Sequence, residues 1–243
     1  MCGRIKKVNC MKNKILTFGF DDAEIHDRKL CEMFRKYGMK STFFILSGQL
    51  GFKCDFHRYG EDTVVERVSA DEIKDTYSGM EVASHTESHK CDPDDFEGTV
   101  GRSMRYLSEL CGYEVRGLAY PGGHYTHELV HNLSQNGVLY SRTATVTHSF
   151  ELPENLLIWN PTCKYDDEDI NALTDEFLAY EGEEPILFYI YGHSYELTQK
   201  EDGKSFESFE KLLQKLSFRD DILYATNKEV AYLLEKRNNN DNS

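Results

Sequence analysis

The sequence lacks the patterns that would place the chain in a membrane, in an oxidising compartment or in the secretory pathway. It contains no run of 18 apolar residues, so we expect no transmembrane helix. Its seven cysteines are scattered and form no Cys-x-x-Cys pair, which argues against a disulfide framework. The first 14 residues are rich in lysine and have no apolar h-region, so they do not form a signal peptide. We therefore expect a cytoplasmic protein, although a truncated N-terminus would leave export open.

Basic residues are also scarce. The chain has 28 Lys and Arg against 42 Asp and Glu, which gives a net charge of −14. A field of this sign repels phosphate backbones and anionic membrane surfaces, so we expect neither a nucleic acid nor a membrane as partner. A neutral substrate is easier to reconcile with this charge than an anionic one. The sequence does not indicate an oligomeric state.

The composition that is present is that of a globular protein. Of the 243 residues, 40% are hydrophobic and 12% are aromatic. A chain of this length buries a large core without needing a disulfide or a metal to fold. Short apolar runs alternate with longer amphipathic stretches, as in repeated βαβ units with right-handed crossovers. Seven or eight such units fit a single-domain α/β barrel better than an open sheet.

The apolar runs have little polar alternation, as expected for strands buried on both faces of a parallel sheet. The predicted strands are residues 14–20, 41–46, 80–84, 115–120, 138–143, 156–159, 185–191 and 222–225. The predicted helices are residues 26–37, 94–110, 126–136, 167–180, 205–216 and 227–236. Segment 49–63 has no periodicity, and we predict a long βα loop there, where function often lies. The polar segment 238–243 is predicted to be a disordered tail.

Unusual polar residues follow several of the predicted strands. Asp21 and Asp22 end the first strand, and His85 ends the third, with His89 four residues further on. His193 follows the seventh strand. In a (β/α) barrel, catalytic groups lie at the carboxyl ends of strands. We therefore expect these side chains to converge on one rim of the barrel.

The two aspartates and the two histidines have a shared chemical rationale. Adjacent buried carboxylates cannot both be ionised without a counter-charge, which a metal bound by one of them supplies while the other stays free as a base. The alternative is a helix N-cap, which explains one aspartate better than two. On a helical turn, residues i and i+4 share one face, so both imidazoles of His85 and His89 reach one ion. Two surface histidines are the alternative, since the chain has nine.

Four short segments, in this order, resemble the polysaccharide deacetylase family, the chitin-deacetylase-like carbohydrate esterases. They are Phe18–Asp22 (FGFDD), Ser84–His89 (SHTESH), Leu118–Gly123 (LAYPGG) and Tyr191–His193 (YGH). The resemblance implies a distorted (β/α) barrel with about seven parallel strands, in a single domain over residues 14–237 that follows an N-terminal extension, 1–13. It also implies one divalent metal ion, most often zinc, with cobalt and nickel as alternatives for a site of two His and one Asp.

The resemblance assigns a role to each matching residue. The implied metal ligands are Asp22, His85 and His89. Asp21 corresponds to the base that activates the metal-bound water, and His193 corresponds to the acid that protonates the leaving amine. Gly122 corresponds to the residue whose backbone N–H helps to hold the oxyanion. This set agrees with the needs of amide hydrolysis, which are an activated water, charge stabilisation and a proton for the departing nitrogen.

The chain departs from the family at several positions. Ala119 stands where the family has an arginine that orients the base, and Arg142 is the candidate substitute, with an ordinary rim salt bridge as the alternative. The family's Asp–Trp motif is not evident, so Trp159 is the candidate pocket wall, with a core position as the alternative. Ile190 lies where the family lines the acetyl-methyl pocket, although a barrel-core residue is equally expected there. Tyr125 is expected to flank the substrate groove.

One further departure lies beside the aspartate pair. Ala23 follows Asp22 where the family has glycine, which is compatible with the motif if residue 23 keeps a negative φ.

We expect a metal-dependent hydrolase that acts on carbon–nitrogen bonds other than peptide bonds and removes an N-acetyl group, or an O-acetyl group in the same site, from a carbohydrate. One alternative keeps the fold but takes a small amide, formamide or imide, which the absence of an export signal favours. An alternative of another class is a catalytically weak carbohydrate-binding barrel. Its only support is the arginine missing at Ala119.

Overall fold

The computed structural model describes residues 12–58, 61–199 and 204–241. Residues 1–11 of the predicted N-terminal extension and residues 242–243 of the predicted tail lie outside the described residues. Within this part of the chain, no helix is long and apolar enough to cross a bilayer.

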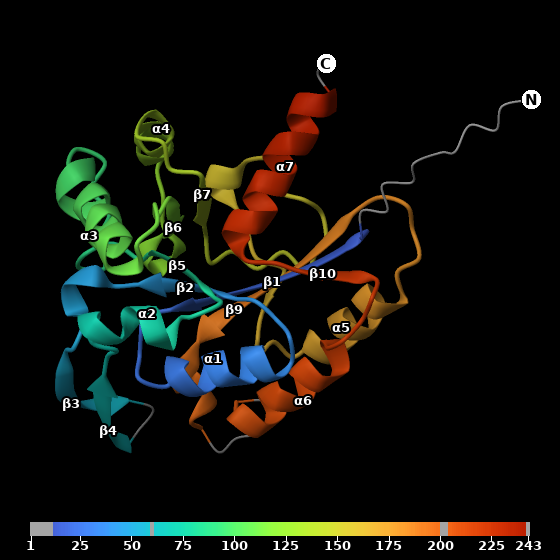
Figure 1. Cartoon of the computed structure of the whole chain (residues 1–243), viewed down its shortest axis with the longest axis horizontal. Helices are drawn as coiled ribbons and strands as arrows, with labels where there is room; N and C mark the ends of the chain where they lie inside the picture. The colour runs from blue at the N-terminus through green and yellow to red at the C-terminus, as the bar shows by residue number, and fades with distance from the viewer. Residues whose placement is uncertain (1–11, 59–60, 200–203, 242–243) are drawn as a thin grey trace, which may run out of the picture.

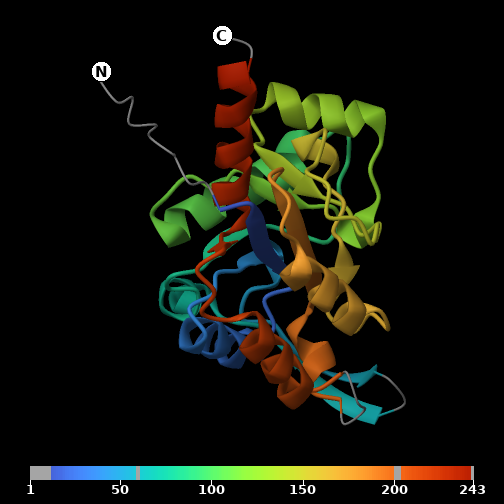
Figure 2. The same ribbon diagram turned by 90° about the vertical axis from the view of Figure 1, so that its right-hand side faces the viewer.

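A curled parallel sheet forms the centre of the molecule (Figures 1 and 2). Its strands are β1 (Lys14–Asp21), β2 (Thr42–Ile45), β5 (Glu81–Ser84), β6 (Gly117–Ala119), β7 (Tyr140–Arg142), β8 (Cys163–Lys164), β9 (Ile186–His193) and β10 (Ile222–Tyr224). Seven of them follow the order β7-β6-β5-β2-β1-β9-β8, and β10 pairs with the first residues of β1. This path confirms the predicted α/β fold, a distorted single-domain barrel with about seven parallel strands.

The two ends of this path, β7 and β8, are joined by a crossing segment rather than by a ladder. The N–H of Trp159 donates to the Ser141 carbonyl on β7 (3.0 Å). Three residues later, the N–H of Thr162 donates to the Tyr189 carbonyl on β9 (2.9 Å). The strand predicted at 156–159 is wrong: Leu156–Ile158 forms a 3-10 turn (η5). The side chain of Asn155, which accepts a hydrogen bond from the Leu157 N–H, caps this turn.

Strand β1 packs against the interior of the barrel on one face and against the helices on the other. All eight residues of β1 are buried, as expected for a parallel strand covered on both faces. Ile15 belongs to the cluster inside the barrel, together with Tyr189. Phe18 and Phe20 belong to the larger cluster between the sheet and the helices. Side-chain alternation along a strand thus assigns odd-numbered residues of β1 to the interior.

Helices surround the sheet, and all but the last bury its outer face (Figures 1 and 2). The last helix contributes Val230, Ala231 and Leu234 to the cluster inside the barrel. The helices are α1 (Asp27–Lys36), α2 (Ile73–Thr76), α3 (Arg102–Cys111), α4 (His127–Gln135), α5 (Ile170–Ala179), α6 (Phe206–Leu216) and α7 (Asn227–Asp241). All six predicted helices are present, but the one expected to begin at residue 94 starts with a π-helical turn at Glu97–Gly101. Helix α7 runs to Asp241, so the chain is still helical in the segment predicted to be a disordered tail.

The loop predicted at 49–63 is instead mostly an antiparallel hairpin. Its strands are β3 (Lys53–Arg58) and β4 (Glu61–Glu66), and residues 59–60 between them lie outside the described part. The hairpin projects from the body of the barrel (Figures 1 and 2). The run Thr63–Val65 has high strand propensity, and an isolated pair of strands needs no long apolar pattern. The sequence pattern therefore did not predict this hairpin.

Candidate active site

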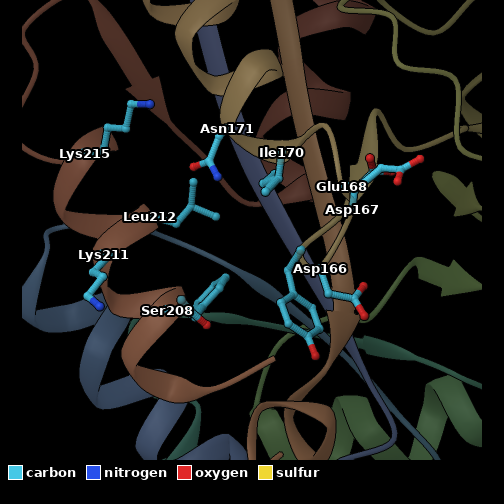
Figure 3. A pocket seen from close by; sticks show the side chains of 11 residues that line it. Asp166, Asp167, Glu168, Ile170, Asn171, Ser208, Lys211, Leu212 and Lys215 are labelled. Atoms are coloured by element: carbon cyan, nitrogen blue, oxygen red, sulfur yellow. The ribbon is translucent and has the colours of Figure 1, made fainter. Parts of the chain in front are cut away.

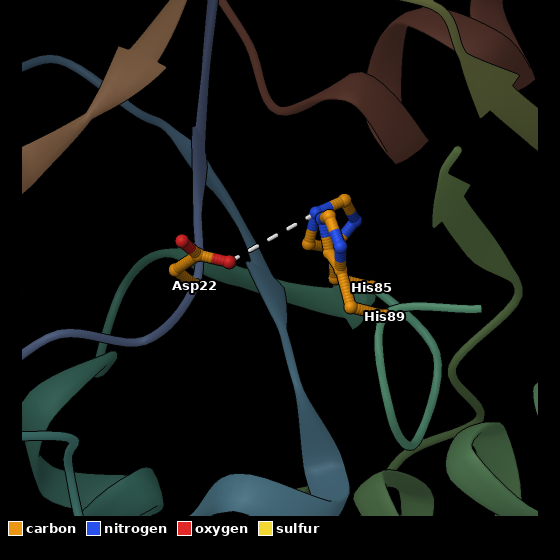
Figure 4. Close-up of side chains that lie close together, drawn as sticks. All are labelled: Asp22, His85 and His89. Atoms are coloured by element: carbon orange, nitrogen blue, oxygen red, sulfur yellow. Dashed lines mark ion pairs between the residues drawn. The ribbon is translucent and has the colours of Figure 1, made fainter. Parts of the chain in front are cut away.

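The three predicted metal ligands lie together at the carboxyl ends of β1 and β5. Asp22 follows β1, His85 follows β5, and His89 lies on the next loop. One ligand atom from each residue lies within 4.8 Å of the others. His85 Nε2 is 4.0 Å from Asp22 Oδ1, and Figure 4 shows the two imidazoles close together on one side of the carboxylate. The structure therefore brings the predicted set together.

The turn that carries the two histidines is not helical, contrary to the prediction. Thr86 and His89 have φ angles of 71° and 61°, in the left-handed region. The ring centroids of His85 and His89 are nevertheless 4.8 Å apart. The side chain of Thr86 accepts the backbone N–H of Lys90 (3.1 Å) and so closes this loop. The four-residue spacing thus brings both rings to one side through an irregular turn.

The environment of His85 fits a metal ligand. Its Nδ1 lies 2.9 Å from the Ala119 carbonyl, which only accepts, so Nδ1 carries the proton and the lone pair of Nε2 faces Asp22. Burial lowers the pKa of His85 against the opposing charges of Asp21 and Asp22, which keeps the imidazole neutral. A neutral imidazole whose other nitrogen is bonded to a carbonyl is the usual arrangement at a metal. The donor set therefore fits a divalent cation.

Asp21 is buried beside this group and is held in its ionised form. Its Oδ2 accepts a hydrogen bond from Arg142 Nη2, while its Oδ1 has no hydrogen-bond partner among the described residues. Burial by itself would raise the pKa of Asp21. The charge and hydrogen bond of Arg142, together with the charge of His193, outweigh burial and hold that pKa below its ordinary value. Asp21 thus offers one free, negatively charged oxygen.

Arg142 comes from the strand next to the position where the family carries its arginine. Ala119 on β6 and Arg142 on β7 are direct partners in register, so both side chains lie at one height in the barrel. The guanidinium lies 5.2 Å from the Phe44 ring and 4.8 Å from the Tyr191 ring, and the side chain is buried. Its contact with Asp21 is therefore a buried ion pair, and the alternative of an exposed rim salt bridge does not describe it.

His193 lies opposite Asp21 on the adjacent strand. The two residues are partners in register on β9 and β1, and His193 Nε2 is 3.9 Å from Asp21 Oδ2. On the other side of the ring, Nδ1 is 3.3 Å from Glu196 Oε2. Burial would lower the pKa of His193, but Glu196 and Asp21 outweigh it and raise that pKa above its ordinary value. His193 is thus favoured in its protonated form.

Glu196 was not predicted from the sequence. It lies in the 3-10 turn Ser194–Leu197 (η6), and its carboxylate accepts the backbone N–H of His193 (3.2 Å) and Lys164 Nζ (2.8 Å). Burial would raise the pKa of Glu196, but the bonds to His193 and Lys164 lower it. The local signal that could have identified this position is a Glu three residues after the end of a strand, in capping-box spacing.

The predicted substrate-facing residues divide into two groups. Gly122, with φ 61°, lies in the turn Pro121–Gly123 (η4) directly after β6. Tyr125 is 39% exposed, and its ring lies 5.5 Å from that of Tyr120. These two residues remain predicted contacts for a substrate, since they follow a strand that ends at the rim.

For Ile190 and Trp159, the structure favours the alternative of a core position over a contact with the substrate. Ile190 is fully buried and packs with Phe188 in the layer between sheet and helices. It faces away from His193, because residues an odd number apart on a strand point to opposite faces. Trp159 is buried inside the barrel, with ring centroids 5.8 Å from Tyr140 and 5.1 Å from Tyr189. Both are therefore core residues.

Ala23 also differs from expectation, because its φ is 58° rather than negative. Together with Asp22, at φ 84°, it turns the chain sharply from β1 toward α1. Two consecutive non-glycine residues in this region are uncommon and are maintained only where the surroundings fix the backbone.

A separate cavity of about 540 Å³ lies between α5 and α6 (Figure 3). Its floor includes Ile170 and Leu212, and one edge carries the consecutive carboxylates of Asp166, Asp167 and Glu168. None of the predicted site residues lines it.

Comparison with known proteins identifies the class. Residues 8–141, more than half of the 243-residue chain, match the model of the polysaccharide deacetylase family, and the chain belongs to this family of hydrolases. The matched segment includes the two aspartates and the two histidines but ends before Arg142 and His193. No curated protein sequence matches the chain.

Solved structures share the fold over nearly the whole chain. The Puue allantoinase has a TM-score of 0.64 at 14% identity and covers 91% of this chain and 90% of its own. A putative polysaccharide deacetylase from Mycobacterium smegmatis has a TM-score of 0.61 at 14% identity, covering 93% and 92%. A family 4 acetyl xylan esterase from Clostridium thermocellum, in complex with a cobalt ion, has a TM-score of 0.55 at 16% identity, covering 90% and 91%.

Three further solved structures, two of them deacetylases and the third IcaB from Ammonifex degensii, match over only 61%, 44% and 57% of their own lengths. At these identities the structural matches establish the fold alone.

Proposed function

We propose that the chain is a metal-dependent deacetylase that removes an N-acetyl group, or an O-acetyl group, from a carbohydrate. One observation carries the proposal. Three potential metal ligands lie within 4.8 Å of one another, and two groups of opposite charge, Asp21 and His193, stand beside them in register. A metal site alone would only bind an ion or a ligand, whereas a metal site with a base and an acid beside it can hydrolyse an amide or an ester.

Asp22, His85 and His89 would hold the ion, which we expect to be zinc, with cobalt or nickel as substitutes. The ion would supply Lewis acidity and so make water nucleophilic near neutral pH. The neutral state of His85 and its bond to the Ala119 carbonyl support this assignment.

Asp21 and His193 would move the protons. As water adds to the acetyl carbonyl carbon, Asp21 takes a proton from it through the oxygen that Arg142 leaves free. The N–H of Gly122 would stabilise the developing oxyanion. When the C–N bond breaks, His193 gives its proton to the leaving nitrogen, and acetate and a free amine result. The pKa of Asp21 is lowered and that of His193 is raised, so both groups start in the required protonation states.

Arg142 and Glu196 would each orient one of these groups. Arg142 binds one oxygen of Asp21 and leaves the other free to accept a proton. Glu196 lies 3.3 Å from His193 Nδ1, and its negative charge stabilises the imidazolium, the form in which Nε2 as well as Nδ1 carries a proton. The alternative of a catalytically weak carbohydrate-binding barrel rested only on the arginine missing at Ala119, and the buried ion pair between Arg142 and Asp21 weighs against it.

The test is acetate release by the zinc-loaded chain from N-acetylated chito-oligosaccharides, with an O-acetylated xylan oligomer as a second substrate. We expect Asp21→Asn to lower turnover about 10²–10⁴-fold while the metal content is unchanged. Asp167→Asn, which alters an aspartate paired with His148 outside this site, is the matched control and should retain turnover. No acetate from either substrate, or full turnover by Asp21→Asn, would contradict the proposal.

A small cyclic amide is the second candidate substrate, because the match to an allantoinase covers 91% of this chain. The same preparation incubated with a hydantoin separates the two. Ring opening without acetate release from sugars would replace the first candidate with the second.

A further inference from the structure

The turn that carries Asp22 is held by a segment distant in sequence, the end of β4. The N–H of Ile25 donates to the Glu66 carbonyl and the N–H of Val68 donates to the Ala23 carbonyl, both at 2.8 Å. Glu24 and Arg67 form an antiparallel bridge between these bonds. This backbone ladder accounts for the left-handed conformation of Asp22 and Ala23, since such strain is maintained only where neighbouring structure fixes it.

One side chain of this segment reaches Asp22 itself. Arg67 is 8% exposed, and its Nη1 donates to the backbone carbonyl of Asp22. The same nitrogen lies 3.9 Å from Asp22 Oδ1. The guanidinium therefore fixes the peptide plane that follows Asp22 and stands beside its carboxylate.

The oxygen beside Arg67 is also the one that faces the histidines. Asp22 Oδ1 is 4.0 Å from His85 Nε2 and 3.9 Å from Arg67 Nη1. Two effects on metal binding then compete. The positive charge of Arg67 repels a cation, whereas the fixed peptide plane holds the carboxylate in place before the cation arrives. Asp22, Glu24 and Asp27 follow one another closely in this turn, so Arg67 also offsets a local excess of carboxylates.

We propose that Arg67 is a positioning residue for Asp22, and that it links the β3–β4 hairpin to the metal site by fixing the Asp22 peptide. This inference rests on the proposed function, because it takes Asp22 to be a metal ligand. The backbone bonds of Glu66 and Val68 involve no side chain of residue 67, so they persist when that side chain is changed.

The test measures metal binding rather than turnover. The metal-free full-length chain is titrated with Co²⁺, and both the dissociation constant and the cobalt d–d absorption spectrum are recorded. Arg67→Met keeps much of the side-chain length but removes the donors and the charge, and Arg67→Lys keeps the charge. Arg35→Met is the matched control, because Arg35 also donates to backbone carbonyls, those of Thr76 and Ser78, on another part of the surface.

We expect Arg67→Met to weaken Co²⁺ binding about tenfold or more and to change the d–d spectrum. Arg67→Lys should fall between this variant and the wild type, and Arg35→Met should match the wild type. Unchanged or tighter binding by Arg67→Met overturns the inference. If circular dichroism shows that Arg67→Met does not fold, Arg67→Lys decides, and wild-type binding with a wild-type spectrum overturns it.

A parallel titration of Asp22→Ala separates this inference from the proposed function. If Asp22→Ala binds Co²⁺ as the wild type does, the ligand set itself is wrong. If Asp22→Ala loses binding while both Arg67 variants retain it, only the role of Arg67 is wrong.

Discussion

The two halves of the chain contribute to the site in different ways. The first half, which matches the family model, supplies the Asp–Asp pair and both histidines from short local motifs. The second half supplies Arg142, His193 and Glu196. Their contacts arise from strand register, from the curl of the sheet that brings β7 opposite β1, and from one tight turn. The comparison teaches that the proposed metal ligands are encoded in local motifs, whereas the residues proposed to orient and protonate are brought into place by the fold.

Substitution of one histidine from each half gives the largest expected effect. His85→Ala should weaken zinc binding by more than about 100-fold, beyond the 10–100-fold cost of losing an outer partner. His193→Ala should bind zinc as the wild type does yet lose about 10²–10⁴-fold in turnover, because it removes only the acid. Metal analysis after dialysis, together with acetate release, measures both. Stoichiometric zinc in His85→Ala would show that the ligand set is wrong.

Moving the arginine between strands is the next test. Arg142→Ala should lower turnover about 100-fold, because Asp21 loses the group that orients it. It should also destabilise the fold by about 3–5 kcal/mol, since a buried carboxylate is left without its partner. The double variant Ala119→Arg/Arg142→Ala returns an arginine to the neighbouring strand at the same height and should restore part of both losses. Urea unfolding and initial rates measure the two effects.

If the double variant is no better than Arg142→Ala in either measurement, register alone does not explain the position of Arg142.

Glu196→Gln should produce a smaller effect, confined to the alkaline side of the pH–rate profile. Glu196 raises the pKa of His193, so its neutralisation lowers that pKa and His193 loses its proton at a lower pH. The alkaline limb should move to lower pH, while the acidic limb, set by the lowered pKa of Asp21, should stay in place. Rates of acetate release across pH measure this change. Glu97→Gln, which breaks an exposed ion pair with Arg105, is the control. If the alkaline limb moved equally in this variant, the proposed effect of Glu196 on His193 would be wrong.

Ile190→Val should have the smallest effect and act on stability alone. The side chain packs between sheet and helices, so removing one methylene should cost about 0.5–1.5 kcal/mol. The kcat/KM for an acetylated sugar should equal that of the wild type, because the side chain does not reach the rim. A change in kcat/KM would show that Ile190 does contribute to the substrate pocket.

Most of the fold follows from sequence because the buried strands and amphipathic helices carry strong patterns. The run at β1 is apolar throughout, and the helix at α1 has Leu30 and Phe34 at helical spacing with Gly38 just beyond its end. The hairpin β3–β4 and the 3-10 turn Leu156–Ile158 escaped prediction. The first lies in a segment with Gly, Cys, His and Asp in which no periodicity is evident, and the second is apolar but too short for a period to distinguish strand from turn.

The site was predictable where its residues lie in short motifs at strand ends, and the structure brings one potential ligand atom each of Asp22, His85 and His89 within 4.8 Å of the others. It was not predictable where the direction of a side chain decides. Ile190 and His193 are three residues apart on β9, and only strand alternation shows that they face opposite layers. Arg67 donates to the carbonyl of Asp22, which is distant in sequence, so no local pattern identifies both donor and acceptor. Glu196 differs, because its bond to the His193 N–H is local and only its spacing from His193 signals it.

The pairing of β1 has a consequence for synthesis on the ribosome. β1 bonds to β2, β9 and β10, and two of these three neighbours come from residues beyond 185. A chain made from its N-terminus therefore exposes one side of β1 until those strands emerge, which takes roughly 10–30 s at ordinary elongation rates. Over that time the open strand is a target for association with other chains. We expect the nascent protein to need shielding and to stay inactive until it is nearly complete, because Asp21 meets His193 only when β9 docks.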